Sequence, residues 1–264
     1  MDLHEKYIYD LQGYITVPDA LDADQLRRLN EEVDRHIEAE CPPDMTTHRF
    51  FDTIDWGGPL LELIDNPRVR AYLDTTIGED AYRLDHVYLD VIRSGKGPIG
   101  TKLHGGGVPT RSLQYYRFEE GRMWNGLSVV AYNLHDVGPM DGGFGAIPGS
   151  HKSNYPLPDE WKEMDELQPV VRRVTGPAGT AIIFTEALAH GTLPWTGDHE
   201  RRTLFFKYSP HASSWYARYY DADDYPDLNE RQRTILEAPN NRYAYRFERT
   251  PGAKPQAEYE KEQK

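Results

Sequence analysis

Cysteine and long apolar runs are nearly absent from this sequence. Cys41 is the only cysteine among the 264 residues, which excludes an intrachain disulfide and a metal site built on several thiolates. The densest apolar stretches, such as residues 181–184, fall far below the roughly 20 residues that span a bilayer. The first ten residues contain no basic segment followed by an apolar one. The sequence therefore predicts a cytoplasmic protein that does not insert into a membrane.

Basic residues are scarce relative to acidic ones. The chain has 43 Asp and Glu against 30 Lys and Arg, which gives a formal net charge of −13. This charge excludes nucleic acids and anionic membranes as partners held by a general electrostatic field. Aromatic residues are abundant, with 18 Tyr, 8 Phe and 5 Trp, and they supply surface for a packed core. We expect one domain over residues 1–264, with a loose tail from about residue 250.

The apolar pattern predicts one clear helix early in the chain. Asp22 is placed to cap it, and Gln25 lies three residues on. Its apolar residues recur at offsets of three, four and four: Leu26, Leu29, Val33 and Ile37. A weaker helix is predicted over residues 58–72, with an interruption at residues 66–67.

From Tyr82 onward, short runs of β-branched and aromatic residues are separated by Gly, Pro and Asp. The predicted strands cover residues 87–92, 126–134, 143–147, 170–174, 180–184 and 203–208. Short strands at such regular intervals are typical of an antiparallel sandwich or barrel.

Three segments carry the side chains expected to do chemistry. His104 lies in Lys-Leu-His-Gly-Gly-Gly, and His190 lies in Glu-Ala-Leu-Ala-His-Gly-Thr after an apolar strand. Arg201 opens the next predicted strand. Since a thiolate cluster is excluded, a metal here would need imidazole and carboxylate ligands.

Together with Ala-Ile-Pro-Gly-Ser-His-Lys at residues 146–152, these segments resemble the phytanoyl-CoA dioxygenase-like superfamily. The similar stretch runs from about residue 104 to residue 208, and residues 11–14 resemble the family's opening. The spacing agrees as well, with 86 residues between the histidines (104 to 190) and 11 from His190 to Arg201.

The resemblance implies a mainly β protein with flanking helices, folded as a double-stranded β-helix (a cupin-like jelly-roll). It further implies a non-haem oxidoreductase that uses Fe(II), 2-oxoglutarate and molecular oxygen on a small-molecule substrate. His104 and His190 would bind the iron. Arg201 would hold the distal carboxylate of 2-oxoglutarate, which a lysine could not grip in the same bidentate way. Thr192 would add a hydroxyl contact to the cofactor.

The sequence departs from the family at Gly106, where relatives usually carry the carboxylate ligand. In one hypothesis, which the sequence slightly favours, chloride binds iron in that place and the enzyme halogenates a C–H bond, as His-x-Gly relatives do. Chloride would restore the missing negative charge. The three glycines at residues 105–107 also fit a simple turn.

Two other hypotheses stay open. Another acid could complete the iron site of a hydroxylase, with Glu186 the first choice and the loop residues Asp136 and Asp141 weaker ones. Alternatively, the chain could be a non-catalytic binding relative that keeps the fold and the Arg201 pocket.

The substrate is poorly specified by the sequence. Residues that could line its pocket are Tyr115, Tyr116, Arg117, Trp124 and Trp195. Arg111 and Arg117 could recognise a phosphate or carboxylate. His151 is expected to be a hydrogen-bonding anchor rather than a metal ligand.

Overall fold

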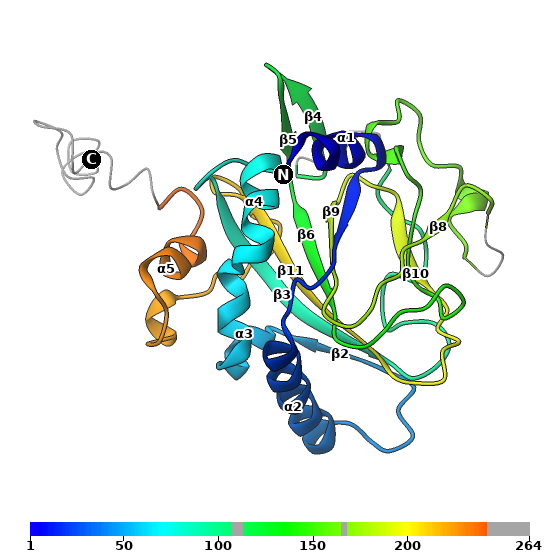
Figure 1. Cartoon of the computed structure of the whole chain (residues 1–264), viewed down its shortest axis with the longest axis vertical. Helices are drawn as coiled ribbons and strands as arrows, with labels where there is room; N and C mark the ends of the chain where they lie inside the picture. Colours follow the sequence, from blue (N-terminus) through cyan, green and yellow to red (C-terminus); the bar gives the residue numbers. More distant parts are fainter. Residues whose placement is uncertain (107–112, 165–167, 242–264) are drawn as a thin grey trace, which may run out of the picture.

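The computed structural model describes residues 1–106, 113–164 and 168–241, and Figure 1 shows two antiparallel sheets with helices on one side of the larger one. The larger sheet has the strand order β1-β9-β6-β11-β3-β2, and a smaller sheet has the order β10-β7-β8. Strands β4 and β5 form a separate hairpin. In these described ranges, no helix combines the length and apolar character that crossing a bilayer requires.

The strands are β1 Tyr14–Val17, β2 Thr47–Phe51, β3 Tyr82–Ile92, β4 Tyr116–Glu119, β5 Arg122–Asn125, β6 Ser128–Asn133, β7 Gly143–Ala146, β8 Arg172–Arg173, β9 Ala181–Thr185, β10 His190–Leu193 and β11 Arg201–Pro210. The α-helices are α1 Leu3–Gln12, α2 Ala23–Glu40, α3 Pro59–Glu62, α4 Pro67–Thr76 and α5 Glu230–Leu236. Short 3-10 helices cover Thr53–Trp56, Leu63–Asp65, Ser150–Lys152, Asp159–Trp161 and Ala222–Asp224.

Alternation along the central strand β11 decides which side chains reach the space between the sheets. Leu204, Phe206 and Tyr208 belong to the core that the helices cover. Phe205 belongs instead to the inner cluster, with Phe144 of the smaller sheet. The other odd-numbered residues named for β11 lie on the same inward face as Phe205: Arg201, Thr203 and Lys207.

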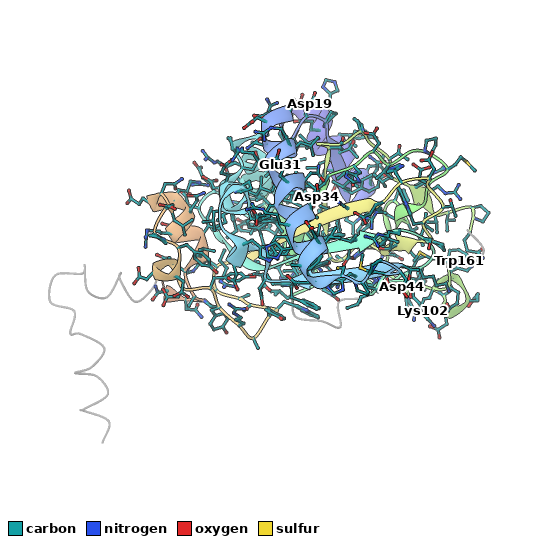
Figure 2. The ribbon with its side chains drawn as sticks, turned by 90° about the horizontal axis from the view of Figure 1, so that it is seen from below. Asp19, Glu31, Asp34, Asp44, Lys102 and Trp161 are labelled. Atoms are coloured by element: carbon teal, nitrogen blue, oxygen red, sulfur yellow. The ribbon has the colours of Figure 1, made fainter. Side chains whose placement is uncertain are left out.

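Helix α2 confirms the predicted helix at residues 22–40. Asp22 accepts a hydrogen bond from the backbone N–H of Gln25, and the Gln25 side chain closes the capping box. Its buried residues include Leu29 and Val33, and Figure 2 shows the helix lying across the sheet. Beneath it, the outward-facing Arg202 of β11 contacts Asp34 at 2.6 Å.

The predicted β-rich fold is confirmed, with strands close to all six predicted runs. The weaker predicted helix is found as α3 and α4, separated at the predicted Asn66-Pro67 break. The sequence reasoning missed α1, α5, β1, β2, β10 and the β4–β5 hairpin. The expected tail from residue 250 lies outside the described residues.

His151 anchors the Pro-Gly-Ser-His turn to α1, as its motif predicted. Its Nε2–H donates to the carbonyl of Asp10 at 3.1 Å, and its ring meets Tyr116 edge-on. Gly13 covers the ring so closely that a Cβ there would lie 2.5 Å from Nδ1. Burial, and then the neighbouring Lys152, lower the pKa of His151 to about 4.

Acid should therefore destabilise the protein partly through His151. An unfolded histidine titrates near pH 6.5, so the unfolded chain binds more protons between pH 6.5 and 4. The contribution of the neutral ring is complete above pH 6.5 and is lost progressively down to pH 4, by up to about 3 kcal/mol. The free energy of unfolding, measured with urea across this pH range, should depend less steeply on pH in the His151→Gln variant than in the wild type. An unchanged slope would contradict the assignment, and His4→Gln on exposed α1 is the matched control.

Candidate metal centre and adjoining cavities

The backbone brings His104 and His190 together. Each donates its backbone N–H to the carbonyl of the other at 2.9 Å, and the two rings lie 4.2 Å apart between centroids. His104 Nδ1 lies 3.1 Å from the Lys102 carbonyl, and His190 Nδ1 lies 2.7 Å from the Leu188 carbonyl. A carbonyl can only accept, so both Nδ1 atoms are the protonated ones. Both Nε2 atoms are then free to bind a metal.

Glu186 completes this pair to a three-residue cluster. One ligand atom from each of His104, Glu186 and His190 lies within 4.8 Å of the other two, so the group could hold a metal ion. Glu186 Oε2 lies 4.0 Å from His190 Nε2. The acid reaches this place because the chain turns between β9 and β10, with the Leu188 N–H donating to the Thr185 carbonyl at 2.9 Å.

Two polar side chains hold the Glu186 carboxylate. Lys207 Nζ lies 2.6 Å from Oε1, and Gln114 Nε2 donates to Oε2 at 3.4 Å. Lys207 was not identified from the sequence. The sequence did contain a pattern that points to it. Lys207 lies six residues after Arg201 on the same strand, and residues an even number apart on a strand face the same side.

The electrostatics of the cluster suit a metal. Burial alone would raise the pKa of Glu186, but Lys207 and the two histidines lower it to about 2. Burial, with His104 beside it, lowers the pKa of His190 to about 3. At neutral pH the cluster therefore offers an ionised carboxylate and a neutral buried imidazole, the forms in which these groups bind metals.

Gly106 is explained by the backbone. Gly105 and Gly106 have φ angles of +79° and +89°, a region that L side chains rarely adopt. A Cβ on Gly105 would lie 2.3 Å from the Leu188 carbonyl oxygen, and one on Gly106 would lie 3.2 Å from the Ala189 Cβ. A carboxylate at residue 106 is thus disfavoured by local conformation, whatever occupies the metal centre.

A cavity of about 430 Å³ opens beside the histidines. Thr192, for which the family resemblance implies a cofactor contact, lies in its wall. Residues of six strands (β2, β3, β7, β9, β10 and β11) and of the segment 99–104 line the cavity. Besides Thr192, they are Arg49, Tyr88, Asp90, Ile99, Gly100, Thr101, Lys102, His104, Phe144, Phe184, His190, Gly191, Phe205 and Lys207. Lys102 is labelled in Figure 2, and its exposed side chain contacts Glu163.

Arg201 is buried at the start of β11, with 2 % of its surface exposed. Its Nε and Nη1 atoms have no hydrogen-bond partner among the described residues, and neither has the Oγ1 of Thr203. Burial lowers the pKa of Arg201 to about 10, so it stays protonated at neutral pH. An unpaired buried guanidinium is costly unless a ligand supplies the missing acceptor.

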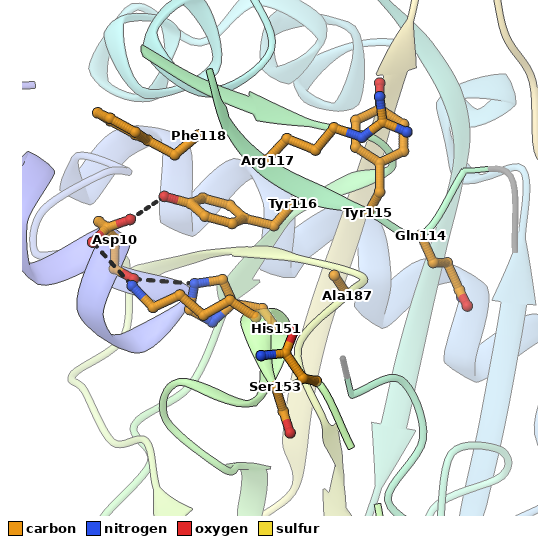
Figure 3. A pocket seen from close by; sticks show the side chains of 11 residues that line it. Asp10, Gln114, Tyr115, Tyr116, Arg117, Phe118, His151, Ser153 and Ala187 are labelled. Atoms are coloured by element: carbon orange, nitrogen blue, oxygen red, sulfur yellow. Dashed lines mark hydrogen bonds and ion pairs between the residues drawn. The ribbon is translucent and has the colours of Figure 1, made fainter. Parts of the chain in front are cut away.

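A second cavity has a volume of about 570 Å³, and Figure 3 shows the side chains that line it. Its wall includes Gln114, which contacts Glu186, and Ala187, which follows Glu186 in the chain. The predicted pocket residues Tyr115, Tyr116 and Arg117 all line it. Tyr116 contacts the Asp10 carboxylate, as Figure 3 shows, and Lys152 contacts the same carboxylate at 3.0 Å.

The remaining sequence candidates lie elsewhere. Trp195 is a core residue packed with Ile92 and Val137, and Trp124 stacks under Arg122 at 3.7 Å. Asp136 and Asp141 accept backbone hydrogen bonds in loops and are not in the metal cluster. Arg111 lies outside the described residues.

A family model described as "Phytanoyl-CoA dioxygenase (PhyH)" matches residues 9–203. No curated protein matches the sequence.

Solved structures share the fold. HygX from Streptomyces hygroscopicus, with nickel and 2-oxoglutarate bound, superposes with a TM-score of 0.73 at 23% identity, covering 84% of this chain and 91% of HygX. HygX with hygromycin B also bound gives a TM-score of 0.69 at 23% identity, with coverage of 84% and 92%. The epimerase SnoN, in complex with Fe3+, alpha ketoglutarate and nogalamycin RO, gives 0.56 at 19% identity, with coverage of 79% and 83%.

Proposed function

Since the chain belongs to the phytanoyl-CoA dioxygenase family, we propose that it is an Fe(II)- and 2-oxoglutarate-dependent oxygenase acting on a C–H bond of a small molecule. The observation that carries this proposal is the cluster of His104, Glu186 and His190. Two imidazoles and one carboxylate are the donor set typical of non-haem Fe(II) oxygenases. Iron and 2-oxoglutarate, when bound, would supply the oxidising chemistry.

Lys207 prepares Glu186 for this role. The ammonium group of Lys207 contacts Oε1 of Glu186. The other carboxylate oxygen, Oε2, faces His190. We expect Glu186 to bind the metal through Oε2 alone. Lys207 would then position the carboxylate and keep it ionised.

Arg201 would bind the distal carboxylate of 2-oxoglutarate. Its buried Nε and Nη1 atoms lack acceptors, and the Thr203 hydroxyl on the same strand face lacks a partner as well. A carboxylate would satisfy the guanidinium with charge-assisted hydrogen bonds. Thr192, whose strand also carries His190, would line the cofactor's path to the metal.

The second cavity is proposed to hold part of the substrate. It adjoins Glu186 through Gln114 and Ala187, and its size suits a small organic molecule. Two neighbours in the same fold hold small molecules, hygromycin B in HygX and nogalamycin RO in SnoN. These complexes support a small-molecule substrate.

Halogenation stays a prediction that rests on Gly106. The positive φ angles of residues 105–106 account for a glycine at position 106 without any role for chloride. Glu186 supplies a carboxylate at the metal cluster, whereas a halogenase would have a halide in place of that ligand. We therefore place oxygenation first and halogenation second.

Anaerobic titration tests the proposal. Fe(II) and 2-oxoglutarate together should produce a weak visible charge-transfer band that Zn(II) does not give, and oxygen should then yield succinate. Absence of the band under saturating conditions would favour the non-catalytic binding relative. A chloride-dependent band shift, followed by chlorinated product, would place halogenation first.

A further inference from the structure

Strand β3 contains a bulge opposite β11, close to the proposed metal ligands. Lys207 pairs with His86 and the next residue, Tyr208, pairs with Leu84, so Asp85 has no partner across the ladder. Consecutive residues of a regular strand point to opposite faces. At this bulge, however, His86 Nδ1 lies 2.7 Å from Oδ1 of the adjacent Asp85. The extra residue therefore allows two neighbouring side chains to form a hydrogen-bonded pair.

Asp85 is held firmly in this arrangement. It is fully buried and accepts hydrogen bonds from the backbone N–H groups of Trp215 at 2.8 Å and Tyr216 at 3.0 Å. Arg83 lies 3.6 Å away. Burial alone would raise the pKa of Asp85, but the hydrogen bonds from His86 and Trp215 outweigh it and lower the pKa. The ionised carboxylate can only accept, so His86 carries its proton on Nδ1.

The other ring nitrogen of His86 is left as an acceptor. His86 Nε2 has no hydrogen-bond partner in the described part of the chain, and the side chain is 13% exposed. The ring lies between Tyr88, at 6.0 Å between centroids, and Tyr216, at 5.0 Å. A buried aspartate that orients a histidine and leaves its Nε2 lone pair unused is the arrangement found where a histidine receives a proton.

This pair lies next to the metal centre. His86 faces Lys207 directly across the ladder, and side chains in that relation have Cβ atoms about 5 Å apart. Lys207 in turn contacts Glu186. Tyr88, two residues along the inward face of β3, lines the cavity that contains His104 and His190. One side chain thus separates His86 from the proposed ligand set.

We propose that His86 Nε2 binds a hydroxyl group of the substrate, so that the enzyme acts on alcohols and presents a nearby C–H bond to the metal. This inference rests on the proposed oxygenase function. A hydroxyl is favoured because Nε2 needs a neutral donor, whereas a substrate ammonium would lie beside the ammonium of Lys207. Asp85 would stabilise the charge on His86 if the hydroxyl proton moved to it.

Nitrogen-15 NMR of histidine-labelled, metal-free protein tests the first step. The expected result is the Nδ1–H tautomer of His86, with the Nε2 lone pair unused. Protonation on Nε2 would overturn the proposal, because no acceptor would then face the substrate.

Matched probes test the second step. The probes are cyclic alcohols, each paired with its O-methyl ether, which keeps the ring and removes the donor. Binding is measured as the perturbation of the anaerobic Fe(II)–2-oxoglutarate band. The wild type should bind at least one alcohol tenfold or more tightly than its ether. His86→Phe should abolish this preference, and His86→Gln, whose amide oxygen can accept near the Nε2 position, should restore part of it.

The outcomes separate the two proposals. If the band never forms, the oxygenase function fails and this inference fails with it. If the band forms normally and no alcohol exceeds its ether, or the preference survives in His86→Phe, only the role of His86 is overturned. The affinity for 2-oxoglutarate should be the same in all three proteins.

Discussion

Glu186→Gln is expected to weaken metal binding on the order of a hundredfold or more and to abolish succinate formation. Glutamine keeps the shape of the side chain and an oxygen for Lys207, so the substitution removes chiefly the negative charge beside His104 and His190. Co(II) titration of the metal-free protein, followed by visible absorption, measures the loss without relying on turnover.

Glu163→Gln is the matched control for this variant. Glu163 is a half-exposed acid that contacts Lys102, two residues before His104, and it is not in the metal cluster. Its substitution should leave Co(II) affinity unchanged. If the Glu186→Gln variant bound Co(II) as tightly as the wild type, the carboxylate would not be a ligand. The halogenase hypothesis, in which chloride takes the place of the carboxylate ligand, would then be favoured.

Arg201→Lys is expected to raise the Kd for 2-oxoglutarate about a hundredfold while leaving Co(II) binding in the absence of 2-oxoglutarate unchanged. The loss corresponds to about 3 kcal/mol, the value of a bidentate charge-assisted contact that a lysine cannot reproduce. Arg49 is not a substitute, because Asp90 holds it at 2.6 and 2.7 Å. Isothermal titration of the Zn(II)-loaded protein with 2-oxoglutarate measures the effect.

The adjacent residue provides the control. Arg202 points to the opposite face of β11 and contacts Glu200 and Asp34. Arg202→Lys should therefore leave the Kd for 2-oxoglutarate at the wild-type value. Equal affinities of the Arg201→Lys variant and the wild type, or equal losses in both variants, would sink the cofactor assignment.

Much of the site was predictable, because its residues follow local rules. His104, His190 and Arg201 lie in motifs with family spacing, and the fold brings both histidines into one cluster. The role of Lys207 could also have been predicted from strand alternation. Glu186 could only be suggested, since its approach depends on the turn between β9 and β10, whose hydrogen bonds leave no pattern in the residue order.

Two features were beyond sequence reasoning. The Asp85–His86 pair depends on a bulge, and one extra residue in a ladder is visible only when both strands are seen together. Helix α1 has a complete capping box at Asp2 and Glu5, but its only buried residue is Tyr9. Without an apolar stripe the periodicity that predicts amphipathic helices is missing.

The backbone pair between His104 and His190 also bears on how the protein matures. These residues are far apart in the chain, and their ring nitrogens become neighbours only after the two segments have met. A metal ion would therefore bind the folded state and not the unfolded chain. At a free metal concentration of 100 times the Kd, binding would raise the free energy of unfolding by about 2.7 kcal/mol. Metal binding would therefore lower the unfolded fraction, and with it the rate of proteolysis, of those molecules in which the two segments have paired. Incompletely folded molecules would gain no such protection.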